Sequence, residues 1–157
     1  MKITLLVIGK TDDSYLLDGI EKYLKRLRHY IKFDIQTLPD IKKTKHLSEQ
    51  EQKTKEADQF LKFIQPHDDV ILLDDKGTEF SSPRFADLLN KKMIASVGHL
   101  IFLVGGPYGF DNSIYQRANH KLSLSKLTFS HQMVRLFFVE QVYRAFTILK
   151  GEPYHHE

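Results

Sequence analysis

The chain of 157 residues contains no cysteine and no tryptophan, and it has only five prolines and eight glycines. The absence of cysteine excludes a disulfide framework, a thiolate nucleophile and a cysteine-based zinc site. No apolar run approaches the roughly 20 residues that a membrane-spanning helix needs, and the run that follows Met1 is too short for a secretory signal. These absences favour a cytoplasmic protein without a membrane partner.

The composition is that of an ordinary globular protein, with 41% hydrophobic and 27% charged residues. The length suits one compact domain, which we expect to span residues 1–157. The net charge is only +3, but one stretch combines several basic residues with no acid: Lys22, Lys25, Arg26, Arg28, His29 and Lys32. Such a cluster either attracts RNA phosphates or forms a solvated helix face, and the sequence leaves both interpretations open.

Hydrophobic periodicity predicts strands that alternate with helices. The expected strands are residues 2–9, 33–38, 70–73, 99–104 and 121–124, with a turn at residues 74–78 after the third strand. The expected helices are residues 15–30, 48–64, 82–95, 111–117 and 131–149. Ser48 and Glu51 have the spacing of a capping box at a helix start. The alternation favours an α/β fold, a mostly parallel sheet with helices on both faces.

Gly105, Gly106 and Gly109 follow the buried strand at 99–104. Glycines allow the backbone to approach a ligand, and ligands of open α/β sheets bind beyond the carboxyl ends of strands. The pattern lacks the GxGxxG spacing of dinucleotide sites, and no Walker lysine follows it. A ligand site and a plain tight turn both fit these glycines.

A hydroxyl-rich loop follows the strand at 121–124. Ser125 and Thr128 suit an adenine edge or a ribose, whereas Ser130 suits a helix cap before His131. Leu72 and Leu73 end another strand and fit either an apolar pocket wall or the core.

The helix at 131–149 is apolar nearly all round, so it lies either at the centre of the core or in a subunit interface. We favour the interface in a chain this small, and we therefore expect a homodimer. Glu140 and Arg144 have the spacing of a helical ion pair. Arg135 is one of the few other polar residues and is expected to face RNA or a carboxylate.

The chain ends in Tyr154, His155, His156 and Glu157, after the last helix, where these side chains are free to reach a substrate. Two histidines without a third ligand at suitable spacing give no metal site, so no metal is expected. A catalytic role, an RNA contact and a disordered terminus all remain open for this tail from its chemistry alone.

Four segments together resemble the ribosomal RNA large-subunit methyltransferase H family of small SPOUT-class enzymes. They are Gly105-Gly-Pro-Tyr-Gly-Phe110, Leu122-Ser-Leu-Ser-Lys-Leu-Thr-Phe-Ser-His-Gln-Met133, Glu140-Gln-Val-Tyr-Arg-Ala145 and Gly151-Glu-Pro-Tyr-His-His156. The likeness covers nearly the whole chain. It implies a C-terminal trefoil knot, S-adenosylmethionine as methyl donor and a homodimer. The implied substrate is N3 of a pseudouridine in 23S rRNA, with the assembled ribosome as the expected setting.

The resemblance also implies roles for particular residues. Leu73, Gly105 and residues 124–129 match cofactor-binding segments, and Tyr154 and His155 match a tail that reaches into the partner subunit's site. His156 stands where the family often has arginine or lysine. The expected cofactor-binding set is Leu72, Leu73, Gly105, Gly106, Gly109, Leu124, Ser125, Lys126, Leu127, Thr128 and Phe129. The expected catalytic set is Tyr154, His155 and His156, and the expected RNA contacts are Lys22, Arg26 and Arg135.

The chemistry of the tail suits methyl transfer to a ring nitrogen. The N3 proton must leave, and a histidine that titrates near neutrality is a suitable base, so His155 or His156 could serve. Tyr154 could equally orient the base. Two alternatives remain: a nonenzymatic ribosome-associated RNA-binding protein, and a nucleotide-binding α/β protein of another reaction class.

Overall fold

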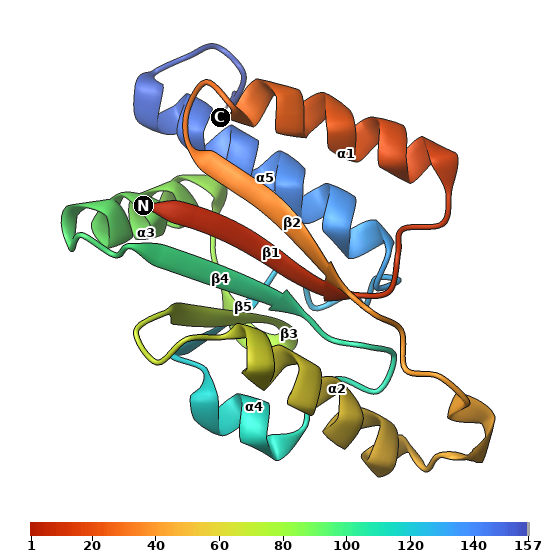
Figure 1. The fold of residues 1–157 in the computed structure, drawn as a ribbon. Helices are drawn as coiled ribbons and strands as arrows, with labels where there is room; N and C mark the ends of the chain where they lie inside the picture. The colour runs from red at the N-terminus through yellow and green to blue at the C-terminus, as the bar shows by residue number, and fades with distance from the viewer. Residues whose placement is uncertain (157) are drawn as a thin grey trace.

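The structure, a computed structural model, describes residues 1–156 and contains one five-stranded sheet in the order β2-β1-β4-β3-β5 (Figure 1). The strands are β1 (Lys2–Ile8), β2 (Lys32–Leu38), β3 (Asp69–Glu79), β4 (His99–Val104) and β5 (His120–Ser123). The helices are α1 (Ser14–Leu27), the short 3-10 turn η1 (Thr44–His46), α2 (Glu49–Phe63), α3 (Ser82–Ile94), α4 (Asn112–Arg117) and α5 (Met133–Lys150). Every neighbouring pair of strands is parallel, which confirms the predicted fold class.

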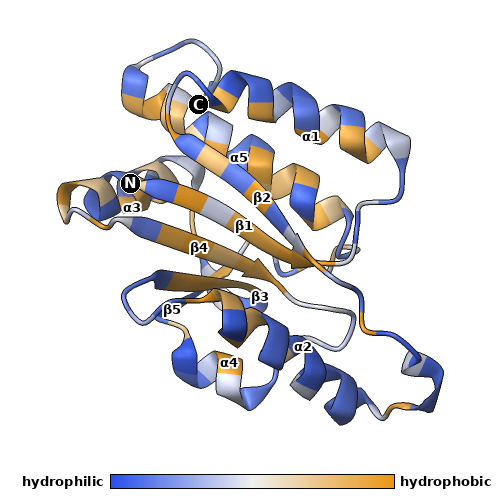
Figure 2. Ribbon diagram, viewed as in Figure 1, coloured by the Kyte–Doolittle hydropathy of each residue, from blue (hydrophilic) through white to orange (hydrophobic). Residues whose placement is uncertain are grey.

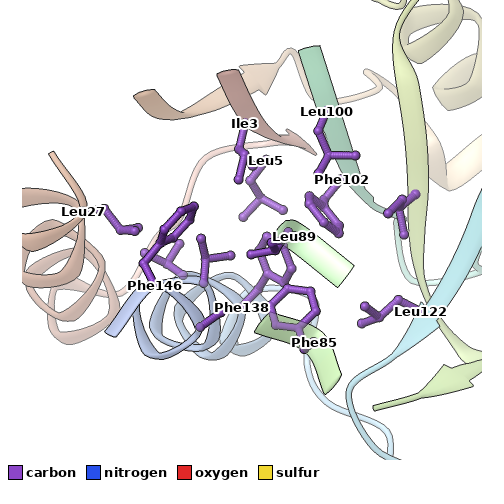
Figure 3. Close-up of a cluster of buried hydrophobic side chains, with 14 of the residues drawn as sticks. Ile3, Leu5, Leu27, Phe85, Leu89, Leu100, Phe102, Leu122, Phe138 and Phe146 are labelled. Carbon is purple, nitrogen blue, oxygen red and sulfur yellow. The ribbon is translucent and has the colours of Figure 1, made fainter. Parts of the chain in front are cut away.

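Helices cover both faces of the sheet because side chains of the central strands alternate between two apolar cores. Ile3 and Leu5 of β1 point to the core that α1, α3 and α5 close, where Phe102 and Phe138 also lie (Figure 3). Leu6 points to the opposite core, which α2 and α4 close. The hydropathy colouring shows the central strands as predominantly apolar between these layers (Figure 2).

The caps that the sequence indicated are present. The Ser48 hydroxyl accepts from the Glu51 amide at 3.1 Å, and the Glu51 carboxylate accepts from the Ser48 amide at 2.7 Å. This is a complete capping box for α2. The Ser130 hydroxyl accepts from the amide of Met133 at 3.1 Å. Helix α5 itself begins at Met133 rather than at His131, and its N-cap, Gln132, makes no side-chain capping bond.

The prediction for the third strand is wrong at its carboxyl end. The sequence pattern placed a turn at residues 74–78, yet β3 continues to Glu79. Leu73 and Thr78 both pair with Leu122 of β5, so residues 74–77 leave the ladder as an irregular bulge. At its end the bulge approaches β5 closely: a Cβ on Gly77 would lie 2.7 Å from the backbone of Leu122. Residues 74–77, which have the composition of a turn, therefore form a bulge within β3.

The apolar helix α5 is central to the core. It packs against the sheet and both neighbouring helices α1 and α3, and it buries Phe138, Val139, Val142, Ala145 and Phe146. One large apolar residue of α5, Phe137, remains 39% exposed. Packing within the chain therefore accounts for most of its apolar composition, and the subunit interface that we expected for this helix stays a prediction. No helix within residues 1–156 is long and apolar enough to cross a membrane.

Gly77→Ala tests the close approach of β3 to β5. We expect it to lower the free energy of unfolding by about 1–3 kcal/mol, because the added methyl group would force the two backbones apart. Gly98→Ala is the matched control, since a Cβ there meets no atom within 4 Å. Urea unfolding followed by circular dichroism measures both variants. Equal stability of the two variants would contradict the contact.

Candidate active site

A cavity of about 380 Å³ lies at the carboxyl ends of β3 and β4, beside the loop that follows β5. Parallel strands bring these ends to one edge of the sheet, where open α/β folds bind ligands. Its size falls within the range of small-molecule sites, roughly 300–1,000 Å³. The lining consists of residues 73–76, 104–110, 124–125 and 127–129, together with Tyr115, His131 and Val134.

Most of the residues expected to bind a cofactor line this cavity. They are Leu73, Gly105, Gly106, Gly109, Leu124, Ser125, Leu127, Thr128 and Phe129. Leu72 and Lys126 are not among the lining residues. Leu72 is fully buried in the core beneath α2 and α4, because successive side chains of a strand point to opposite faces.

A backbone hydrogen bond closes the glycine turn after β4. The Gly109 amide donates to the carbonyl of Gly106 at 3.1 Å, and the two residues form an isolated bridge. Gly109 has a φ of +78°, in the left-handed region that favours glycine. Phe110 then packs on Phe60 of α2, with ring centroids 6.2 Å apart. The turn thus brings glycine backbone to the cavity wall, beside Pro107, Tyr108 and Phe110.

The bulge in β3 contributes polar groups that the sequence pattern did not reveal. The Tyr115 hydroxyl donates to Asp74 Oδ2 at 2.5 Å, and the Lys76 amide donates to Asp74 Oδ1 at 2.8 Å. Desolvation, and then the Asp74 carboxylate, raise the pKa of Tyr115 above its usual value. These residues were missed because the segment was predicted to be a plain turn. They give the cavity a fixed carboxylate, with Asp75 as a second one on its wall.

The serines of the loop after β5 brace the loop itself. The Ser123 hydroxyl donates to the carbonyl of Ser125 at 2.8 Å, and the Ser125 hydroxyl accepts from the amide of Leu127 at 3.0 Å. The Leu127 side chain is 73% exposed and lies on the cavity wall. The loop therefore offers an apolar side chain supported by a hydrogen-bonded backbone.

Tyr154 of the tail packs against α1 and α5 instead of standing free, whereas the catalytic role expected of the tail stays a prediction. The Tyr154 hydroxyl donates to Glu140 Oε1 at 2.9 Å and lies 3.2 Å from the Tyr23 hydroxyl. The Tyr154 ring packs edge-on against Tyr143, with centroids 4.7 Å apart, and the Arg144 guanidinium lies 4.8 Å from it. Burial, and then the hydrogen bonds to Tyr23 and Glu140, raise the pKa of Tyr154.

The other tail residues are held less closely. His155 Nδ1 lies 3.3 Å from Arg144 Nη1, and Arg144 forms the predicted ion pair with Glu140. His156 is exposed, and Glu157 lies outside the described residues.

The tail and the cavity lie at opposite ends of α5. The cavity includes Val134 in the first turn of this helix, whereas Tyr154 follows its last turn. Its 18 residues span about 27 Å at 1.5 Å per residue. Figure 1 shows the C-terminus beside α1. One chain therefore does not bring its expected catalytic residues to its own cavity.

The expectation that Arg135 faces RNA is wrong. Its side chain is 2% exposed, and its guanidinium donates to the carbonyls of Ile8 and Gly9 at 2.8 Å each and to the Thr11 hydroxyl at 3.0 Å. Arg135 thus ties the start of α5 to the end of β1. Burial lowers its pKa from the usual value. The mostly apolar sequence of this helix did not indicate that the Arg135 guanidinium would be buried against β1.

The two other expected RNA contacts lie on α1. Lys22 is exposed, and the Arg26 guanidinium lies 5.7 Å from the Tyr23 ring and 5.5 Å from the Tyr143 ring. A second cavity, of about 310 Å³, lies beside it and is lined by Lys25, Arg26, His29, Tyr30 and Tyr143. Within residues 1–156 no group of three or more acidic, histidine or cysteine side chains is arranged to hold a metal ion.

The sequence matches a family described as "Predicted SPOUT methyltransferase" over residues 1–155. A protein of Parabacteroides distasonis named ribosomal RNA large subunit methyltransferase H is 56% identical over 157 residues, 100% of both chains. A protein of the same name from Bacteroides thetaiotaomicron is 51% identical over 157 residues, again 100% of both chains. The chain belongs to the SPOUT methyltransferase family.

The resemblance drawn from the four motifs is therefore confirmed, and solved structures of methyltransferases share the fold of this SPOUT protein. The methyltransferase Lpg2936 from Legionella pneumophila, determined with bound SAM, aligns with a TM-score of 0.50 and 12% identity over 92% of this chain. A methylase family protein from Haemophilus influenzae aligns with a TM-score of 0.50 and 13% identity over 95% of this chain. The chain spans 66% of the length of each of these proteins.

Proposed function

We propose that this chain transfers a methyl group from S-adenosylmethionine to large-subunit ribosomal RNA, at N3 of a pseudouridine in 23S rRNA. The observation that carries the proposal is the cavity at the carboxyl ends of β3 and β4. It occurs in a chain that is 56% identical over its full length to a protein named as a large-subunit rRNA methyltransferase. The trefoil knot implied by the family likeness and the cytoplasmic location favoured by the sequence stay predictions.

The residues of the cavity suit S-adenosylmethionine, which supplies a methyl group on a positively charged sulfur. The glycine turn at 105–109 offers backbone to the nucleoside, and Leu73, Leu124 and Leu127 offer apolar contact to the adenine ring. Asp74, fixed by Tyr115, can accept from ribose hydroxyls or from the ammonium group of the ligand. The donor carries its own leaving group, so this chain needs to position the substrates and accept a proton.

The separation of tail and cavity supports an active site shared between two copies of the chain. Exposed apolar side chains gather near the start of α5: Phe129 and Phe137 pack together with centroids 5.2 Å apart, and Tyr15 contacts Met133. Large exposed apolar groups favour association. A two-fold dimer that covers them can place the tail of one copy beside the cavity of the other.

In that arrangement the tail contacts the RNA base. His155 accepts the N3 proton or orders the group that accepts it, and Tyr154 orients the base by stacking or by a hydrogen bond. The contacts of Tyr154 with Glu140 and Tyr23 fix it on the helical framework, which limits the motion lost on binding. His156 is the exposed member and contacts the RNA backbone.

The basic stretch of α1 supplies a surface for the RNA. Arg26 lies over two tyrosine rings next to Lys25 and His29, and this combination of cations with aromatic faces suits unpaired nucleotides and their phosphates. Tyr143 connects this surface to Tyr154 of the tail. The RNA surface and the proposed base contact are therefore continuous.

Leu127→Lys tests the cofactor cavity. We expect S-adenosylmethionine to bind at least about tenfold more weakly, because apolar contact is lost and a cation repels the sulfonium; tenfold corresponds to about 1.4 kcal/mol. Ile94→Lys is the control, because Ile94 is 75% exposed and lies at the end of α3. Titration calorimetry measures both. Wild-type affinity in Leu127→Lys would place the donor elsewhere, and a wild-type protein that binds RNA but no donor would favour a nonenzymatic RNA-binding protein.

Mixing two impaired variants tests the shared active site. One variant carries Leu127→Lys and the other lacks residues 153–157. At a donor concentration between the dissociation constants of the wild type and of Leu127→Lys, each variant alone should transfer few labelled methyl groups to ribosomes, whereas a mixed dimer should regain one working site. The absence of rescue, despite subunit exchange shown by mass spectrometry, would mean that each tail serves its own cavity.

Arg26→Ala tests the RNA surface. We expect weaker binding to a large-subunit rRNA hairpin and a salt dependence of log K that is less steep by about 0.9 for each lost phosphate contact. Arg84→Ala removes an exposed arginine from α3 and serves as the control. Fluorescence anisotropy at several salt concentrations gives both slopes. Equal slopes for the two variants would show that Arg26 lies on a solvated face.

A further inference from the structure

Glu56 is a buried carboxylate behind the glycine turn. It lies on α2 and is only 5% exposed. Its hydrogen-bond donors are neutral: the Gln52 side-chain amide at 3.0 Å from Oε1, and the backbone amide of Gly106. Burying a carboxylate among neutral partners is costly, because the charge loses its hydration. An apolar side chain at this position would avoid that cost but could not accept a hydrogen bond from the Gly106 amide.

The carboxylate and the turn fit closely. A Cβ on Gly106 would lie 2.5 Å from Glu56 Oε1, so position 106 must be glycine for the two to meet. The turn is tied to α2 at both ends, at Gly106 by Glu56 and at Phe110 by the ring of Phe60. The same turn forms a wall of the cavity, since residues 104–110 line it. Glu56 therefore acts on the cavity through the backbone of its wall.

We infer that Glu56 is a positioning residue of the methyl-donor site: it fixes the Gly106 turn and places a negative charge behind it that favours the cationic donor over the neutral product. This inference rests on the proposed function. S-Adenosylmethionine carries a sulfonium cation, whereas S-adenosylhomocysteine has a neutral thioether. A charge in a poorly solvated site acts over a longer range than one in water. Glu56 thus strengthens binding of the donor without strengthening binding of the product.

The charge on Glu56 depends on pH. Burial raises its pKa above the usual value, the nearby His131 and the hydrogen bonds from Gln52 and Gly106 lower it, and Asp40 raises it. The sulfonium favours the ionised carboxylate, so donor affinity should be full above the pKa of Glu56 and should fall as the pH drops through it. His131 lines the cavity and, when protonated, repels the donor in the same direction. The contribution of His131 to the pH dependence of donor affinity must therefore be removed separately, by the substitution His131→Asn.

Two variants of the full-length chain separate the charge from the hydrogen bond. Glu56→Gln keeps an oxygen that accepts from Gly106, whereas Glu56→Ala removes both the oxygen and the charge. Asp58→Asn, an exposed acid two positions along the same helix, is the matched control. Dissociation constants for S-adenosylmethionine and S-adenosylhomocysteine are measured by calorimetry. Urea unfolding identifies any loss of fold.

We expect Glu56→Gln to weaken binding of the donor by about tenfold, the scale of a lost charge contribution, and to leave product binding within about twofold. Glu56→Ala should weaken both ligands, and Asp58→Asn neither. With His131→Asn as background, the pH dependence of donor affinity should disappear in Glu56→Gln. Equal loss for donor and product in Glu56→Gln would overturn the electrostatic role. Unchanged binding in Glu56→Ala would overturn the positioning role.

The ligand-free protein provides a readout that is independent of the cofactor. Hydrogen exchange of the Gly106 amide, followed by nuclear magnetic resonance, should be accelerated in Glu56→Ala and close to wild type in Asp58→Asn. Unaltered exchange in Glu56→Ala would show that the carboxylate does not hold the turn. A wild-type chain that binds no S-adenosylmethionine would overturn the proposed function and the electrostatic role, while the exchange result would still decide the hold on the turn.

Discussion

The rest of the structure depends on two close approaches of glycine backbone to neighbouring elements at the carboxyl edge of the sheet. Gly77 brings the bulge of β3 against the backbone of Leu122, and Gly106 brings the turn after β4 against the carboxylate of Glu56. A Cβ at either glycine would separate elements that form the cavity. Burial of the Glu56 carboxylate costs hydration free energy, and the packing of the turn must offset this cost. Both contacts are this close because glycine has no Cβ.

Helix α5 fixes the position of the tail relative to the cavity. Arg135 fastens its first turns to the end of β1 through the carbonyls of Ile8 and Gly9, and the apolar core holds the remainder between α1 and α3. The helix keeps the tail at a fixed distance from the cavity, on the opposite side of the core. A rigid helix that separates two functional groups within a chain makes a second copy the natural means of joining them.

The sequence predicted the elements well wherever the determining interactions are local. The capping box of Ser48 and Glu51 and the continuous apolar run of β4 depend on neighbours a few positions away. The prediction failed where distant partners decide. Asp74 to Gly77 have the composition of a turn, but pairing of both Leu73 and Thr78 with Leu122 makes them a bulge. In the sequence, Arg135 resembles a surface cation on an apolar helix. Only the folded chain brings the carbonyls of Ile8 and Gly9 next to its guanidinium.

The sequence by itself determined the fold class, the family and the segments that line the cavity, because apolar periodicity, glycine position and motif order are recorded in the chain. Only the tertiary structure decided that Leu73 lies on the cavity while Leu72 enters the opposite core, and that Tyr154 rests on Tyr23 and Glu140. It alone also placed Glu56 against Gly106, residues 50 positions apart in the sequence. Such pairings depend on how the helices pack across the sheet, and periodicity in the chain specifies which face is apolar but not which residue it meets.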